Sequence, residues 1–135
     1  AFIGTPHIAG YSFDGKVNGT RQIYEAACRF LNREADWDPS PLLPPPDCEE
    51  VIINGAAVDR PAEIRKAVFS VYDVRKDDAA MRGILQEAQP ARGKYFDALR
   101  KNYPRRREYL LTRVRVEPQN QDLVRCLAGL GFISR

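Results

Sequence analysis

Apolar and polar residues alternate along residues 108–116, the pattern of a strand with one buried face. The alternation puts four residues on one face: Leu110, Thr112, Val114 and Val116. A shorter apolar stretch over residues 50–55 ends in Asn54-Gly55, which is typical of a strand followed by a turn. Residues 1–4 are also apolar, and we expect them to be the end of a short buried strand.

Residues 16–32 have the apolar spacing of a helix. One stripe along this helix consists of Val17, Thr20, Tyr24, Ala27, Cys28 and Leu31, and a second consists of Ile23, Ala26 and Phe30. Two apolar stripes predict a helix that is buried on more than one side, between two packed bodies.

Four further helices are expected, each from apolar spacing and from residues that favour helix ends. The first starts at Asp59-Pro61, the second at Asp77 or Asp78 and runs to Gln89-Pro90, the third lies within 95–103, and the last follows Asn120 and closes at Gly129 and Gly131. Phe132 and Ile133 are expected to pack back onto this last helix.

Residues 35–48 contain five prolines, which exclude a regular helix or an interior strand. We interpret them as a semi-rigid linker that Trp37, Leu42 and Leu43 attach to a surface. A ligand for a polyproline-binding domain is the alternative. The sequence therefore predicts three parts: residues 1–34, the linker 35–48, and a small α+β domain over 49–135 with few, antiparallel strands.

The composition is that of a globular protein, with 44% hydrophobic and 29% charged residues among 135. No apolar run is long enough to span a bilayer and no signal-peptide pattern begins the chain, so no membrane partner is expected. The cysteines, Cys28, Cys48 and Cys126, are widely spaced, which fits reduced thiols in a cytoplasmic protein better than a zinc site or a disulfide framework. Because the chain starts with Ala1-Phe2-Ile3 and not with methionine, we expect it to be a piece of a larger protein.

Charge is distributed unevenly along the chain. Residues 1–90 carry 10 basic and 14 acidic residues, whereas residues 91–135 carry 11 basic and 4 acidic ones. A basic final third could bind phosphate or nucleic acid, or could be a solvated surface. The aromatic residues there have helix-core spacing and are not interleaved with the basic ones as a stacking platform would be, so no nucleic-acid partner is expected.

The first fifteen residues hold the only candidate for acid–base chemistry near neutral pH, His7, which is the single histidine. It follows Thr5-Pro6, where proline favours an extended turn, and precedes Gly10, which allows a positive φ. The residues alone leave two interpretations open: a catalytic histidine, or one that caps a strand end or fills a polar pocket. No Gly-x-Gly-x-x-Gly, Walker loop, Gly-x-Ser-x-Gly or His-Glu-x-x-His motif occurs, and a metal site would lack a second histidine.

The loop Thr5-Pro6-His7-Ile8-Ala9-Gly10 resembles the late signature of the D-isomer-specific 2-hydroxyacid dehydrogenases, Thr-Pro-His-Ile-Gly/Ala-Gly. The continuation Tyr11-Ser12-Phe13-Asp14-Gly15-Lys16 is similar to a subgroup that oxidises a phosphorylated hydroxy acid in pyridoxine biosynthesis. The linker, the Arg-Arg-Arg-Glu-Tyr run and Leu-Ala-Gly-Leu-Gly-Phe resemble the C-terminal extension of that subgroup.

This resemblance implies a role for three residues of the loop. His7 falls on the catalytic histidine, which exchanges the proton of the C2 hydroxyl while NAD accepts the hydride. Gly10 falls where the family backbone lies against NAD, and Tyr11 falls where the substrate is contacted. The helix 16–32 would cross between the nucleotide and substrate domains, and the C-terminal extension would form a homodimer.

Other parts of the family pattern are missing. The dinucleotide fold, the substrate-binding arginine and the carboxylate that tunes the histidine lie upstream in the family. We therefore expect this polypeptide by itself to bind no NAD and to catalyse nothing. Arg105-Arg106-Arg107 either reach a substrate phosphate, form a solvated turn, or form ion pairs with the acidic half. A stand-alone α+β association module without catalysis remains the alternative function.

Overall fold

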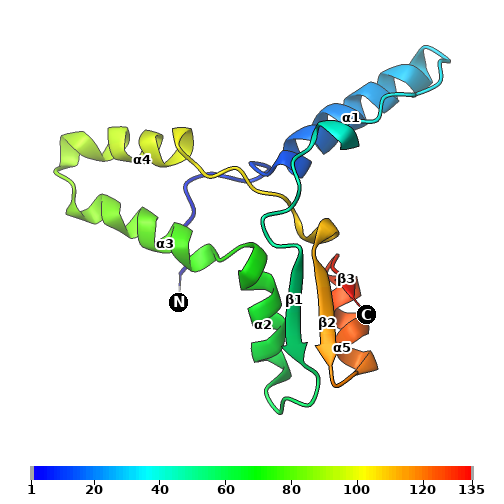
Figure 1. The fold of residues 1–135 in the computed structure, drawn as a ribbon. Coiled ribbons are helices and arrows are strands. Elements are labelled where there is room, and N and C mark those ends of the chain that lie inside the picture. Colours follow the sequence, from blue (N-terminus) through cyan, green and yellow to red (C-terminus); the bar gives the residue numbers. More distant parts are fainter. Residues whose placement is uncertain (1, 135) are drawn as a thin grey trace.

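The computed structural model describes residues 2–134 as a small α/β unit with a helical hairpin and one projecting helix (Figure 1). The α-helices are α1 (Phe13–Phe30), α2 (Arg60–Val71), α3 (Val74–Arg82), α4 (Arg92–Lys101) and α5 (Gln121–Gly129), and the strands are β1 (Glu50–Asn54), β2 (Arg113–Glu117) and β3 (Ile133–Ser134). Within these residues, no helix is both long and apolar enough to cross a membrane. The predicted mixture of helices and strands is confirmed.

The three strands form one sheet in the order β1-β2-β3, and both pairings are parallel. The prediction of antiparallel strands is therefore wrong. The reason lies in the connections: α2, α3 and α4 stand between β1 and β2, and α5 stands between β2 and β3. A helical crossover returns the chain to the same end of the sheet, so the next strand runs in the same direction.

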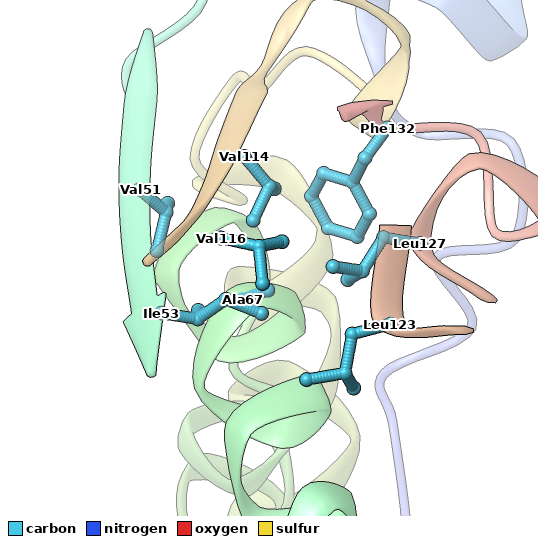
Figure 2. Close-up of a cluster of buried hydrophobic side chains, with 8 residues drawn as sticks. All are labelled: Val51, Ile53, Ala67, Val114, Val116, Leu123, Leu127 and Phe132. Atoms are coloured by element: carbon cyan, nitrogen blue, oxygen red, sulfur yellow. The ribbon is translucent and has the colours of Figure 1, made fainter. Parts of the chain in front are cut away.

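The core lies between one face of this sheet and the helices α2 and α5 (Figure 2). Eight apolar residues form it: Val51, Ile53, Ala67, Val114, Val116, Leu123, Leu127 and Phe132. Both long strands alternate buried and exposed residues, so each sends every second side chain into this core. The opposite sheet face is uncovered, and Ile52, in the middle of the edge strand β1, is 45% exposed there.

The helix starts were predicted with mixed success. Asp59 caps α2 as expected, because its carboxylate accepts a 2.9 Å hydrogen bond from the Ala62 N–H. The α3 helix begins earlier than predicted, after Asp73, whose carboxylate accepts from the Arg75 N–H. It also ends at Arg82, followed by 3₁₀ turns over Gly83–Gln86 and Gln89–Ala91.

The linker residues 35–48 contain no α-helix or strand, only a 3₁₀ turn at Ser40–Leu42. They begin by returning along α1, where the Tyr24 hydroxyl donates to Asp36 and the Trp37 ring meets the Tyr24 ring edge-to-face at 5.8 Å. The predicted attachment through Trp37 is thus observed, while Leu42 is exposed. The division of the chain into three domains stays a prediction.

The expectation that residues 16–32 form a doubly buried helix is wrong for the described chain. Asp14 is the only buried residue of α1, which starts three residues earlier than predicted and extends away from the sheet (Figure 1). Ile23 is 74% exposed and Phe30 is 88% exposed. The linker covers the first stripe only in part, through Trp37 on Tyr24, and the second stripe, which holds Ile23 and Phe30, is left exposed by residues 2–134.

Residues 2–4 do not form a strand, contrary to expectation. The sheet lies elsewhere, and these residues bind to α3 instead: the Gly4 N–H donates to Asp78 at 2.9 Å, and the Phe2 carbonyl accepts from Arg82. Phe2 is 82% exposed in this arrangement.

Candidate functional site

The loop that carries His7 bends sharply and presents the imidazole to solvent. His7 has a φ of 58°, in the left-handed region, and its N–H donates to the Thr5 carbonyl at 2.9 Å. Pro6 and Ile8 on either side are buried, whereas His7 is exposed. Within residues 2–134 the imidazole forms no hydrogen bond or ion pair with another side chain, so its nitrogens are free to meet a ligand.

Ser12 and Gly15 join this loop to α1. The buried Ser12 hydroxyl accepts a 2.9 Å hydrogen bond from the Gly15 N–H and so caps the helix. An added Cβ at Gly15 would lie 3.0 Å from the Gly10 Cα, so a glycine lets the loop pass close to the helix start. Gly10 itself has a φ of 71°, a conformation that glycine adopts without strain.

Asp14 holds the start of α1 to a segment more than ninety positions away. Its two carboxylate oxygens accept hydrogen bonds of 3.0 and 2.9 Å from the Arg107 guanidinium, and one oxygen also accepts from the Glu108 N–H at 2.8 Å. Arg107 donates in addition to the Pro44 carbonyl. Both charged side chains are buried, and this fork-to-fork geometry is the strong form of an ion pair.

The environment of Asp14 favours its charged form. Burial by itself raises the pKa of this carboxyl, but the hydrogen bonds from Arg107 and from the Glu108 N–H outweigh burial and hold the pKa below its usual value. Asp14 is therefore a carboxylate at neutral pH, committed to Arg107 and not to proton transfer.

Tyr11 lies between His7 and the helix start, and its ring contacts two other elements. The Tyr103 ring meets it edge-to-face at 6.0 Å, and the Lys16 ammonium lies 4.7 Å from its centroid. Tyr11, Phe13, Lys16 and Arg105 line a cleft of about 300 Å³. A polar and cationic cleft thus opens beside the histidine loop.

Asp77, in α3, joins the residues at the end of α2 and just after α4. Its carboxylate accepts hydrogen bonds from the hydroxyls of Tyr72 at 2.6 Å and Tyr103 at 2.9 Å. Burial, and then the Asp77 carboxylate, raise the pKa of both tyrosines above the ordinary value, so both stay neutral donors. A second hollow of about 350 Å³ lies between α3 and α4, with Pro6 and Tyr103 in its wall.

The arrangement can exchange one proton through His7 and can bind an anion through the cations of the cleft. Within residues 2–134, no group of three or more acidic, histidine or cysteine side chains is arranged to hold a metal ion. The structure brings His7, Gly10 and Tyr11 together on one loop, as the sequence predicted, but it does not test their roles.

The family comparison covers the C-terminal unit. Residues 42–131 match the family described as a domain of unknown function, DUF3410. The chain belongs to this family. Its bounds include β1, β2 and α2 to α5, together with part of the proline-rich linker, and end just before Phe132 and β3.

Curated relatives extend the similarity to the histidine loop. The erythronate-4-phosphate dehydrogenase of Pseudomonas syringae pv. syringae is 42% identical over 131 residues, which is 97% of this chain and 34% of the relative. The enzymes of the same name from Ectopseudomonas mendocina and Cellvibrio japonicus are 45% and 41% identical, over 94% and 96% of this chain and 34% and 35% of the relatives. The predicted resemblance is confirmed, and the chain spans about a third of the length of these relatives.

Sequence reasoning missed the main contact of the site. It gave Asp14 no contact of its own and left Arg107 open between phosphate binding, a solvated turn and an ion pair with the acidic half. The structure selects the ion pair for Arg107. No local pattern could have matched these two residues, because they are 93 positions apart.

We predict that Asp14→Asn lowers the free energy of unfolding at pH 7 by about 3 kcal/mol, because it leaves Arg107 buried without its partner charge. The pKa of Asp14 is lower in the folded chain than in the unfolded chain, where it is about 4. The pair therefore stabilises the fold fully at pH values above the unfolded-state pKa, and this stabilisation is lost as the pH falls through the folded-state pKa. Urea unfolding followed by circular dichroism should therefore show a difference between variant and parent that narrows below about pH 4.

Asp122→Asn is the matched control for this experiment. Asp122 also pairs with an arginine, Arg125, but both side chains are exposed, so the expected loss is below about 1 kcal/mol. Equal effects of the two variants at pH 7 would contradict a special role for the Asp14 pair.

Proposed function

We propose that this chain forms the C-terminal part of an NAD-dependent 4-phosphoerythronate dehydrogenase. The whole enzyme would oxidise 4-phospho-D-erythronate to the 2-oxo acid on the route to pyridoxal phosphate. The observation that carries this proposal is the 42% identity to an erythronate-4-phosphate dehydrogenase over 97% of the chain, His7 loop included. A cytoplasmic location is part of the proposal, supported by three cysteines that are all free thiols.

His7 is proposed as the general acid and base of this reaction. Its imidazole would accept the proton of the substrate's C2 hydroxyl during oxidation and return it in reverse. Two features support the role: the side chain is exposed, and the left-handed backbone holds it away from the packed residues Pro6 and Ile8. Tyr11, on the same loop, is proposed to contact the substrate.

This chain is proposed to supply only part of the NAD site. An added Cβ at Gly10 would meet no atom within 4 Å, so the backbone there is open to a large neighbour, in keeping with a contact to the cofactor. The chain has no glycine-rich turn of the kind that binds the phosphates of a dinucleotide. The other residues that hold NAD, and a carboxylate to orient His7, would come from the rest of the enzyme.

The C-terminal unit is proposed to form a homodimer through its open sheet face. Ile52, in the middle of the edge strand β1, is the apolar residue of this face, and its neighbours carry both signs of charge: Glu50 and Glu117 are acidic, and Arg113 and Arg115 are basic. A surface with an apolar residue among balanced charges can match a second copy of itself across a twofold axis.

Joining this chain to the remaining two thirds of the Pseudomonas syringae relative tests the proposed function. The chimera should form NADH from 4-phosphoerythronate, and His7→Asn should lower kcat at least about 100-fold, because the acid–base group is lost. Gln22→Ala, on the exposed side of α1, serves as the control and should leave kcat within about twofold.

Three results would count against this proposal. A folded chimera without dehydrogenase activity would refute the assignment to this enzyme. Full activity of His7→Asn would refute the role of the histidine. NADH formation by the isolated 135-residue chain would refute the view that its site is incomplete.

The dimer is tested by sedimentation equilibrium of the isolated chain. We expect twice the chain mass of 15.3 kDa, and we expect Ile52→Asp to give the monomer because it places a charge in the buried face. Val58→Asp is the control, since Val58 is fully exposed in the turn before α2 and should leave the dimer intact. A monomeric parent chain, or a dimeric Ile52→Asp variant, would contradict the proposed interface.

A further inference from the structure

The three consecutive arginines that end the loop after α4 have different surroundings. Arg107 is paired with Asp14, and the Arg106 guanidinium lies 3.2 Å from the Glu108 carboxylate. Arg105 is exposed and forms no ion pair or hydrogen bond with any of residues 2–134. Two of the three charges are thus neutralised within the chain, and the third remains available to a ligand.

Lys16, in the first turns of α1, is a second cation without a carboxylate partner among the described residues. An aromatic ring positions each of these two cations. The Lys16 ammonium lies 4.7 Å from the centroid of the Tyr11 ring, and the Arg105 guanidinium carbon lies 5.8 Å from the centroid of the Phe13 ring. A ring face attracts a cation but leaves its net charge intact, unlike a carboxylate.

These four side chains are the lining of the cleft described above, whose volume is about 300 Å³. No acidic residue lines it, and the acids nearest in sequence, Asp14 and Glu108, are engaged by Arg107 and Arg106. The volume is several times the roughly 30 Å³ that one water molecule occupies, so the cleft can admit a phosphate group with some of its hydration.

We infer that this cleft binds the phosphate group of the substrate, with Arg105 and Lys16 as its two cationic contacts. The inference rests on the proposed function, in which the C2 hydroxyl lies at His7. Arginine donates paired hydrogen bonds to phosphate oxygens, and lysine adds a mobile point charge. Tyr11 belongs both to the histidine loop and to the cleft wall, so the cleft lies next to the loop that carries His7.

Steady-state kinetics of the chimera test the inference. Lys16→Gln together with Arg105→Gln should raise KM for 4-phosphoerythronate at least tenfold, while kcat and KM for NAD change less than threefold. Arg105→Lys should retain more affinity than Arg105→Gln. The control is Arg29→Gln at the other end of α1, about 20 Å along the helix from Lys16, which should leave all three parameters unchanged.

A rise in KM for NAD in place of the substrate would overturn the inference, because the cleft would then serve a phosphate of the cofactor. An unchanged KM for 4-phosphoerythronate, or an equal loss with Arg29→Gln, would overturn it as well.

Titration of the isolated chain, followed by amide chemical shifts in NMR, gives a second readout that needs no dehydrogenase activity. The amides of Tyr11, Lys16 and Arg105 should shift saturably with 4-phosphoerythronate and with inorganic phosphate, but not with erythronate. The doubly substituted chain should lose at least three quarters of these shifts. An inactive chimera with these shifts would refute the proposed function and leave the phosphate site standing.

Two results of the titration would refute the site itself. One is an equal response to erythronate, which lacks the phosphate. The other is a response to phosphate that is centred elsewhere or is unchanged in the doubly substituted chain.

Discussion

The ion pair between Asp14 and Arg107 is the contact on which the arrangement of this chain depends. It is buried, bidentate and supported by the Glu108 N–H, and it joins residues 93 positions apart. Because Arg107 also donates to the Pro44 carbonyl, three segments meet at one guanidinium: the start of α1, the end of the proline-rich linker and the segment between α4 and β2. Few apolar contacts link α1 to the sheet core. This ion pair, together with the hydrogen bonds of residues 2–4 to α3 and the Tyr11–Tyr103 ring contact, therefore holds the histidine loop beside the C-terminal unit.

That placement accounts for the chemistry proposed here. With Arg107 and Arg106 neutralised by nearby carboxylates, Arg105 is the arginine of the run that remains free, and it faces the same cleft as Tyr11 and Lys16. The exposed imidazole of His7 and the cationic cleft then belong to one surface. The exposed apolar side chains of α1 and the uncovered sheet face agree with a unit that is completed by other domains and by a second copy.

The local parts of this structure could be predicted from the sequence, and the long-range parts could not. The capping residue Asp59 is a local signal, and α2 begins where it predicts. The alternation predicted a strand over residues 108–116, but only its second half is confirmed: β2 begins at Arg113, and Tyr109–Leu111 form a 3₁₀ turn in which Leu110 is exposed. Asp77 and Asp78 resembled helix starts, but their carboxylates bind tyrosine hydroxyls and the Gly4 N–H, and Asp73 caps α3 instead.

Strand direction depends on the path of the intervening helices, and the partner of Asp14 is too distant in the sequence for any local pattern to reveal it. The family signature predicts roles for His7, Gly10 and Tyr11, but it carries no information about the cations beside Tyr11.

A double-mutant cycle on Asp14 and Arg107 tests the central claim, that this buried pair holds the histidine loop to the C-terminal unit. The free energy of unfolding would be measured for the parent chain, for Asp14→Asn, for Arg107→Gln and for the double variant at pH 7. The account predicts a coupling energy of about 2 kcal/mol, in the range found for residues in one buried network. Effects that add within about 0.5 kcal/mol would show that the two side chains act independently and would contradict the account.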